Sequence, residues 1–137
     1  MSCGDIIAIF ASFISAVGVF VSVIIYLNTV NNKKKILTIQ EFSKIREKYP
    51  NMSSKYANNN ERLEYLKEME RFFVGIHYKI YDIEIVKDMS GHLLVKQYDS
   101  YMKDLVQSRR ELKSKFSAYE QYEETIKKIR KDLGERK

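Results

Sequence analysis

An unbroken apolar run occupies the N-terminal part of the chain. From Ile6 to Leu27 no side chain carries a charge, and fourteen of the 22 residues are Ile, Val, Leu or Phe. As an α-helix this run would be roughly 33 Å long, which matches a hydrocarbon core of about 30 Å. Its apolar side chains favour membrane insertion by roughly 4–8 kcal/mol. The run therefore predicts a transmembrane helix, which we place at residues 6–28 after an extracytoplasmic tail, residues 1–5.

Two other interpretations of this run are weaker. A core helix of a soluble protein is usually apolar along one stripe, whereas this run is apolar on all sides. A cleaved signal peptide begins with basic residues, and none precedes Ile6. Ala16, Val17 and Gly18 resemble a cleavage site, but the apolar run continues beyond them, so cleavage there would leave an apolar new N-terminus.

Three consecutive lysines predict how this helix is oriented. Lys33, Lys34 and Lys35 follow the apolar run directly, and the opposite flank carries only Asp5. Because basic residues are enriched on the cytoplasmic side, we expect the N-terminus outside and the C-terminal domain in the cytoplasm. We expect these lysines to contact anionic headgroups at the surface of the cell (inner) membrane.

Small residues recur along the apolar run at helical spacing. Such residues allow the backbones of two membrane helices to approach closely. We therefore predict a helix–helix interface at two stripes, although small residues are common in single spans without any partner. One stripe contains Ala8, Ser12 and Ala16, and the other contains Ala11, Ser15, Gly18 and Ser22.

The helical pattern continues past the lysines. Ile36, Ile39, Phe42, Ile45 and Tyr49 recur every three or four residues. We therefore expect the membrane helix to continue into a basic stalk helix, residues 29–49. Pro50 ends it, and the polar residues 50–60 are predicted to form a loop.

Amphipathic helices are predicted over residues 61–137. The first runs over about 61–81, with Asn58 and Glu61 resembling a capping box. Asp82 can cap a short helix, 83–89, which Ser90 and Gly91 would end. A strand over residues 80–85 is the alternative, but no second strand is evident to pair with it.

Two further helices complete the predicted cytoplasmic domain. One runs over about 92–110, and the last follows a capping box formed by Ser117 and Glu120 and stops at Gly134. The fold class is therefore all-α: one transmembrane helix continuing into a stalk, then a small cytoplasmic bundle of amphipathic helices, residues 61–137.

Charge is confined to the part of the chain after the apolar run. All 24 Lys and Arg residues lie at or beyond Lys33, and the chain has a net charge of +6. Basic residues alternate with acidic ones, as on solvated helix faces, and a positive domain beside a membrane suits anionic headgroups. Nucleic acid is the less favoured partner.

No catalytic or metal-binding pattern is recognisable. His77 and His92 are the only histidines, they lie on different predicted helices, and Cys3 is the only cysteine. The five glycines form no phosphate-binding loop. We therefore expect neither enzymatic activity nor a cofactor or metal.

The chain is rich in tyrosine, with ten residues and no tryptophan. Tyr98, Tyr101, Tyr119 and Tyr122 follow helical spacing. Their amphipathic rings suit either the core of the bundle or a surface for a partner. Core spacing favours the first interpretation.

Residues 72–110 resemble an uncharacterised family of small bacterial membrane proteins. The shared pattern is a pair of phenylalanines on a helix, an acidic cap, and an aromatic helix ending in arginine; here these are Phe72, Phe73, Asp82, Tyr98, Tyr101 and Arg109. The resemblance extends over 61–110 and, more loosely, over 6–49. It implies a single span, a basic stalk and a helical cytoplasmic domain of unknown function.

Three functions remain in competition. The first is a non-enzymatic, membrane-anchored interaction or scaffold protein whose bundle binds itself or a cytoplasmic protein partner. The second is an oligomerising membrane effector, of the kind used in defence or toxin modules, that perturbs the bilayer. The third is nucleic-acid or nucleotide binding by the basic domain, which predicts a steep salt dependence.

Overall fold

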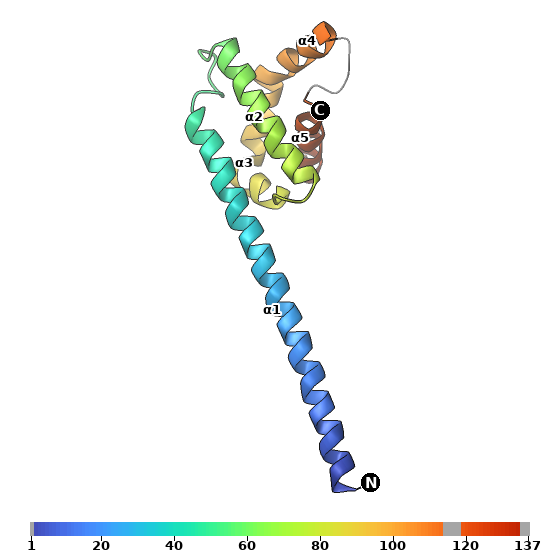
Figure 1. Cartoon of the computed structure of the whole chain (residues 1–137). Coiled ribbons are helices and arrows are strands. Elements are labelled where there is room, and N and C mark those ends of the chain that lie inside the picture. Colours follow the sequence, from blue (N-terminus) through green and yellow to red (C-terminus); the bar gives the residue numbers. More distant parts are fainter. Residues whose placement is uncertain (1, 114–118, 135–137) are drawn as a thin grey trace. The chain divides into compact units, whose positions relative to one another are not determined.

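Helices make up most of the described part of the chain. The computed structural model describes residues 2–113 and 119–134, and no strand occurs in these ranges. The predicted all-α class is therefore confirmed, including the choice of helix over strand after Asp82 (Figure 1). The elements are α1 (Cys3–Lys48), α2 (Asn59–His77), α3 (Ile83–Gln97), the π-helix η1 (Tyr98–Met102), α4 (Lys103–Lys113) and α5 (Glu120–Asp132).

The chain divides into two compact units within α1. Unit 1 comprises Met1–Lys34 and unit 2 comprises Lys35–Lys137. The helix continues from the apolar run into the stalk, as the sequence predicts, and it includes the asparagines between them. In unit 1, the hydroxyl of Ser22 donates to the carbonyl of Gly18 at 2.9 Å and that of Thr29 to Ile25 at 2.8 Å. These hydroxyls therefore need no partner outside the helix.

Unit 2 has an aromatic core centred on α2. Phe72 stacks on Phe42 of α1, with ring centroids 5.6 Å apart, and Phe73 stacks on Tyr122 of α5 at 5.4 Å. Tyr122 in turn lies 5.6 Å from Tyr98. Leu66, Met69, Val86, Met102, Val106, Ile126 and Ile129 complete this core with almost no exposed surface.

The buried face of α1 differs from the predicted stripe. Phe42 and Ile45 are buried as expected, but Ile36 and Ile39 are exposed. Thr38 is fully buried instead, and its hydroxyl accepts a hydrogen bond from the Asp82 amide at 2.8 Å. The requirement for a polar partner at the start of α3 therefore shifts the contact surface of α1.

Two of the predicted helix caps are confirmed. The side chain of Asn58 accepts from the Glu61 amide at 2.8 Å, and that of Asp82 accepts from the Glu84 amide at 2.9 Å. The predicted stop at Ser90 and Gly91 is wrong in part: the backbone leaves helical dihedrals at Ser90, but the chain continues as helix to Gln97. Kinks of this kind are typical of Ser/Gly pairs.

The start of α5 is capped by a residue of α2. Ser117, the predicted capping residue, lies outside the described residues. The residue before the helix is Tyr119, whose backbone has a left-handed conformation and whose side chain provides no cap. The Glu70 carboxylate accepts the amides of Gln121 at 3.1 Å and Tyr122 at 2.7 Å. A carboxylate at this position also interacts favourably with the positive end of the helix dipole.

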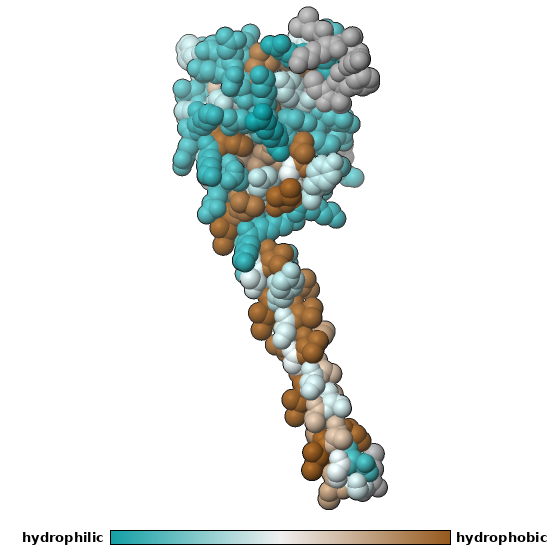
Figure 2. All heavy atoms as spheres, in the orientation of Figure 1, coloured by the Kyte–Doolittle hydropathy of each residue, from teal (hydrophilic) through white to brown (hydrophobic). Residues whose placement is uncertain are grey.

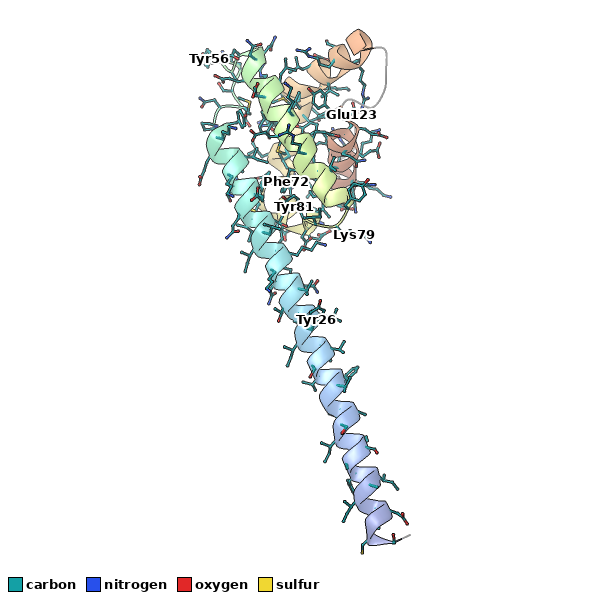
Figure 3. All side chains as sticks on the ribbon, viewed as in Figure 1. Tyr26, Tyr56, Phe72, Lys79, Tyr81 and Glu123 are labelled. Atoms are coloured by element: carbon teal, nitrogen blue, oxygen red, sulfur yellow. The ribbon has the colours of Figure 1, made fainter. Side chains whose placement is uncertain are left out.

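Helix α2 ends earlier than predicted because the chain reverses after His77. Lys79 has φ of 61°, and the amides of Ile80 and Tyr81 both donate to the Gly75 carbonyl. The turn folds Tyr81 back onto α2, where its ring stacks on Phe72 at 4.7 Å (Figure 3). A side chain at Gly75 would collide with the Tyr81 ring.

We expect Gly75→Ala to destabilise unit 2 by about 1–3 kcal/mol, because the added methyl group must displace the Tyr81 ring from its stack. The midpoint of thermal unfolding of the full chain measures this effect. Gly4→Ala is the matched control, since an added Cβ there makes only an ordinary contact, 3.6 Å from the Ser2 side chain. Equal unfolding midpoints for the two variants would contradict the close packing at Gly75.

We expect Glu70→Ala to cost about 1–2 kcal/mol, since two amides at the start of α5 lose their acceptor. Urea unfolding measures this loss of stability. An unchanged stability would show that the Glu70 side chain is solvated and does not cap α5. Glu70→Gln keeps one acceptor and provides a second test, because burial raises the pKa of Glu70 despite the two amide donors. Desolvation of the carboxylate thus outweighs the amide donors and the favourable helix dipole, so the stability of the wild type should fall relative to Glu70→Gln as pH rises through this pKa.

Candidate interaction surfaces

Unit 1 exposes a continuous apolar surface. Its helix is long and apolar enough to span a membrane, and none of its most hydrophobic window is buried. Figure 2 shows hydrophobic side chains along this part of α1, in contrast to the mostly hydrophilic surface of unit 2. A core helix would be covered by protein, so this surface needs a cover of another kind. The absence of burial thus separates this helix from an ordinary core helix.

The small residues of unit 1 are all exposed on α1. Ala11, Ser15, Gly18 and Ser22 fall within an arc of about 60° at 3.6 residues per turn. A shallow groove follows three of these four residues and is lined by Ser15, Gly18, Val19, Ser22, Val23 and Tyr26. The other predicted stripe, Ala8, Ser12 and Ala16, lies beside this arc. Both stripes are therefore accessible to another helix.

The three predicted membrane-surface lysines lie at the junction of the units. Lys34 ends unit 1 and Lys35 begins unit 2. Lys33 and Lys35 are exposed, whereas Lys34 is half-buried.

Unit 2 exposes apolar side chains on α1 and on the turn after α2, and we call this set of residues the turn surface. It comprises Ile36 and Ile39 of α1 together with Tyr78 and Ile80 of the turn after α2. The hydrogen bond from Asp82 to Thr38 holds this turn beside α1. Tyr78 and Ile80 are 71% and 54% exposed. Ile36 and Ile39 belong to the helical stripe that the sequence predicts along the stalk, and both are exposed in the structure, as is Ile80.

The four tyrosines predicted at a partner surface lie at different depths. Tyr122 is fully buried and Tyr98 is 9% exposed, while Tyr101 and Tyr119 are half-buried at the edge of the core. The Tyr98 hydroxyl donates to Glu123 at 3.0 Å. Burial raises the pKa of both Tyr98 and Tyr122. Tyr98 and Tyr122 therefore contribute to the core of the bundle rather than to an accessible surface.

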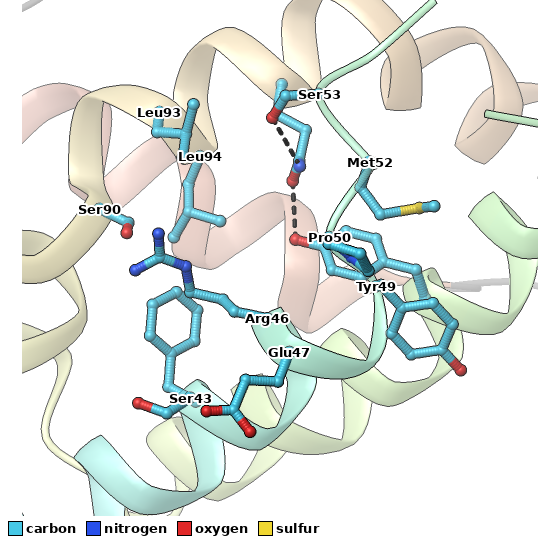
Figure 4. Close-up of a pocket in the computed structure, with 13 residues that line it drawn as sticks. Ser43, Arg46, Glu47, Tyr49, Pro50, Met52, Ser53, Ser90, Leu93 and Leu94 are labelled. Carbon is cyan, nitrogen blue, oxygen red and sulfur yellow. Dashed lines mark hydrogen bonds between the residues drawn. The ribbon is translucent and has the colours of Figure 1, made fainter. Parts of the chain in front are cut away.

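A pocket in unit 2 was missed by sequence reasoning. Its volume is about 410 Å³, and it lies between the C-terminal turns of α1, the loop after Pro50, α2 and α3 (Figure 4). Its lining includes Phe42, Arg46, Met52, Tyr65, Ser90, Leu94 and Gln97. Because these residues come from four separate segments, no local motif reveals them.

The histidines and the cysteine lie on separate elements. Cys3 is exposed in unit 1, His77 ends α2 and His92 is on α3. Within residues 2–113 and 119–134, no group of three or more His, Cys, Asp or Glu side chains is placed to hold a metal ion.

Comparison with known proteins identifies one family. The family described as Domain of unknown function (DUF4760) matches residues 12–129, which includes most of unit 1 and nearly all of unit 2. No curated protein and no solved structure matches the chain.

Two buried tyrosines should respond oppositely to loss of the hydroxyl. The hydroxyl of Tyr122 is buried and has no hydrogen-bond partner among the described residues, so Tyr122→Phe should stabilise unit 2 by about 1 kcal/mol. The Tyr65 hydroxyl donates to the Gln97 side chain at 2.7 Å, and Tyr65→Phe should destabilise by about 1–2 kcal/mol. Chemical unfolding of the full chain checks both values. A loss of stability in Tyr122→Phe would show that this hydroxyl has a partner.

Proposed function

We propose that this chain, which belongs to the DUF4760 family, is a single-pass membrane protein without catalytic activity whose helical unit 2 binds itself or a protein partner. The exposed apolar surface of unit 1 carries the proposal. Water would have to solvate this whole surface in a soluble protein, whereas a bilayer covers it at no such cost. The backbone groups of α1 are satisfied inside the helix, as a membrane requires.

The charge distribution supports the orientation. The only charged residue before the lysines is Asp5, and Lys33, Lys34 and Lys35 follow the apolar run. The positive-inside rule then places unit 2 in the cytoplasm and Cys3 outside. The resemblance to small bacterial single-span proteins supports the cell (inner) membrane as the location, with anionic headgroups next to the lysines.

The turn surface supports binding by unit 2. Ile36, Ile39, Tyr78 and Ile80 present apolar side chains to solvent, although unit 2 has a complete core without them. Aromatic and aliphatic side chains of this kind anchor protein interfaces when a partner covers them. We therefore propose that this surface joins two copies of the chain or one copy and a cytoplasmic protein.

The single cysteine provides a direct test of orientation. A membrane-impermeant maleimide applied to intact cells should label Cys3 in the full chain. In the matched control, Cys3→Ser combined with Tyr56→Cys, labelling should appear only after lysis, because Tyr56 is 85% exposed on unit 2. The reverse pattern would contradict the orientation. Recovery of a chain shortened near Gly18 would show a cleaved signal sequence in place of an anchor.

Assembly is tested with the full chain in nanodiscs, by native mass spectrometry. We expect complexes of two or more copies, and Ile80→Ser should weaken them because it removes an apolar side chain from the turn surface. Tyr56→Ser is the matched control: it also removes an exposed apolar ring, but from outside that surface.

A second pair of variants tests whether unit 1 contributes to assembly. Gly18→Ile fills the small-residue groove, and its matched control, Ile24→Phe, adds bulk on another face of α1.

The outcomes separate the competing functions. Dissociation by Ile80→Ser alone supports assembly through unit 2. Dissociation by Gly18→Ile alone places the interface in the span and favours the membrane-effector alternative. A monomer in nanodiscs that also forms no crosslink to another protein in native membranes would contradict the proposed interaction role.

A further inference from the structure

The pocket in unit 2 has a buried floor and an open rim. Phe42, Met52, Tyr65 and Leu94 form the floor and are nearly inaccessible to solvent. Arg46, Glu47, Ser53 and Leu93 line the rim and are exposed. A volume of about 410 Å³ lies within the range of small-molecule sites. The pocket therefore combines an apolar base with charged and polar groups around its opening.

One wall of the pocket is a regular helical segment between two irregular ones. Ser90, Leu93, Leu94 and Gln97 lie on one face of α3 at spacings of three, one and three residues. The break at Ser90 precedes this segment and the π-helix η1 follows it. Gly91, beside the break, lies against Leu133 and Ile129, so the helix approaches α5 there. π-Helical turns within α-helices occur frequently at functional sites.

Ser90 presents an unsatisfied hydroxyl to the pocket. The residue is 7% exposed, and its Oγ has no hydrogen-bond partner within residues 2–113 and 119–134. Buried polar atoms nearly always have a hydrogen-bond partner, because burying one without a partner destabilises the fold by its full desolvation free energy. A serine that supported only the kink would normally bond to the preceding turn of its own helix. The hydroxyl is instead available to a group inside the pocket.

Arg46 provides a positive charge at the same end of the pocket. In the described part of the chain no carboxylate forms an ion pair with Arg46, although Lys48, Lys87, Arg110 and Arg130 all have acidic partners. Its guanidinium lies over the Phe42 ring, 5.8 Å from the centroid, and this cation–π contact favours its position beside the pocket. In the view of Figure 4, the guanidinium of Arg46 and the hydroxyl of Ser90 point toward one another.

The opposite end of the pocket is polar and neutral. The Gln97 amide nitrogen donates to the Ser53 hydroxyl at 3.2 Å, and its oxygen accepts from Tyr65 at 2.7 Å. These bonds hold the amide in one orientation, and they are drawn as dashed lines in Figure 4. The hydroxyl of Ser53 is exposed at the rim and has further hydrogen-bonding capacity.

We propose that this pocket binds a small organic anion that carries one acidic group and a flat apolar body. A carboxylate or a phosphate ester is held by the guanidinium of Arg46 and the hydroxyl of Ser90, which supply charge-assisted hydrogen bonds. The apolar body lies against Leu93 and Leu94. Glu47 on the rim offsets part of the charge of Arg46, so the site favours a ligand with one acidic group over a polyphosphate.

The test uses benzoate and phenyl phosphate as anionic probes and benzamide as their neutral counterpart. Ligand-observed saturation-transfer NMR on the full chain, in phosphatidylcholine nanodiscs that carry no net lipid charge, measures each dissociation constant, with protein-free nanodiscs as background. We expect at least one anion to bind saturably and at least tenfold more tightly than benzamide. Preference for benzoate or for phenyl phosphate identifies which anionic group the site accepts.

Arg46→Gln should weaken binding of the anion at least tenfold and leave benzamide unchanged, since it removes the charge and little of the packing. Arg71→Gln is the matched control, because Arg71 is an exposed arginine on α2 outside the pocket. Ser90→Ala should weaken the anion about threefold to tenfold. Leu93→Trp should block all probes by filling the rim.

Three results would overturn the proposal. They are equal affinity for benzoate, phenyl phosphate and benzamide; equal effects of Arg46→Gln and Arg71→Gln; and unchanged anion binding in Leu93→Trp. Thermal unfolding of each variant establishes that the pocket is still folded, and Ser90→Cys, of similar size, replaces Ser90→Ala if the kink is lost. Binding of the probes does not depend on assembly of the chain in the membrane. The test of the pocket and the tests of the proposed function can therefore fail independently.

Discussion

The pair of phenylalanines at the centre of α2 is the constraint on which unit 2 depends. Adjacent residues on a helix point about 100° apart, so Phe72 and Phe73 cannot face the same neighbour. Phe72 stacks on Phe42 of α1 and on Tyr81 after the turn, whereas Phe73 stacks on Tyr122 of α5. Helix α2 must therefore have α1 on one side and α5 on the other. Loss of either ring would leave a cavity where α2 meets α1 or where it meets α5.

The remaining features of unit 2 adapt to that arrangement. Glu70, one turn before Phe73, caps α5, which places the start of that helix where Tyr122 can reach the Phe73 ring. Gly75, one turn after Phe72, leaves the space that Tyr81 occupies. Helix α3 packs on α5 through Gly91, and its opposite face, with Ser90 and Gln97, lines the pocket next to α1. The pocket is thus a consequence of α1 packing on Phe72 while α3 packs on α5.

Local chemistry made part of this structure predictable. The apolar run, the caps at Asn58 and Asp82 and the all-α class depend on residues close together in sequence, and each was correctly predicted. The role of Thr38 and the capping of α5 by Glu70 depend on partners 44 and about 50 residues away, which no periodicity reports. For the same reason the periodicity of the stalk includes Ile36 and Ile39, which are exposed, and omits Thr38, which is buried. Arg46 and Ser90 are ordinary in the sequence and become notable only because the fold brings them to one cavity.

One helix links the two proposals, because Arg46 and the apolar run both belong to α1. Sharing an element is not enough for a ligand to control assembly. A ligand shifts an equilibrium between a monomer and a complex only by the difference in its affinity for the two, and equal affinity shifts nothing however tight the binding is. Coupling would therefore require the last turns of α1 to change their packing on Phe72 or α3 when copies associate. The Phe42 ring is the contact through which such a change would pass, since it stacks on Phe72, lies under the guanidinium of Arg46 and forms part of the pocket floor.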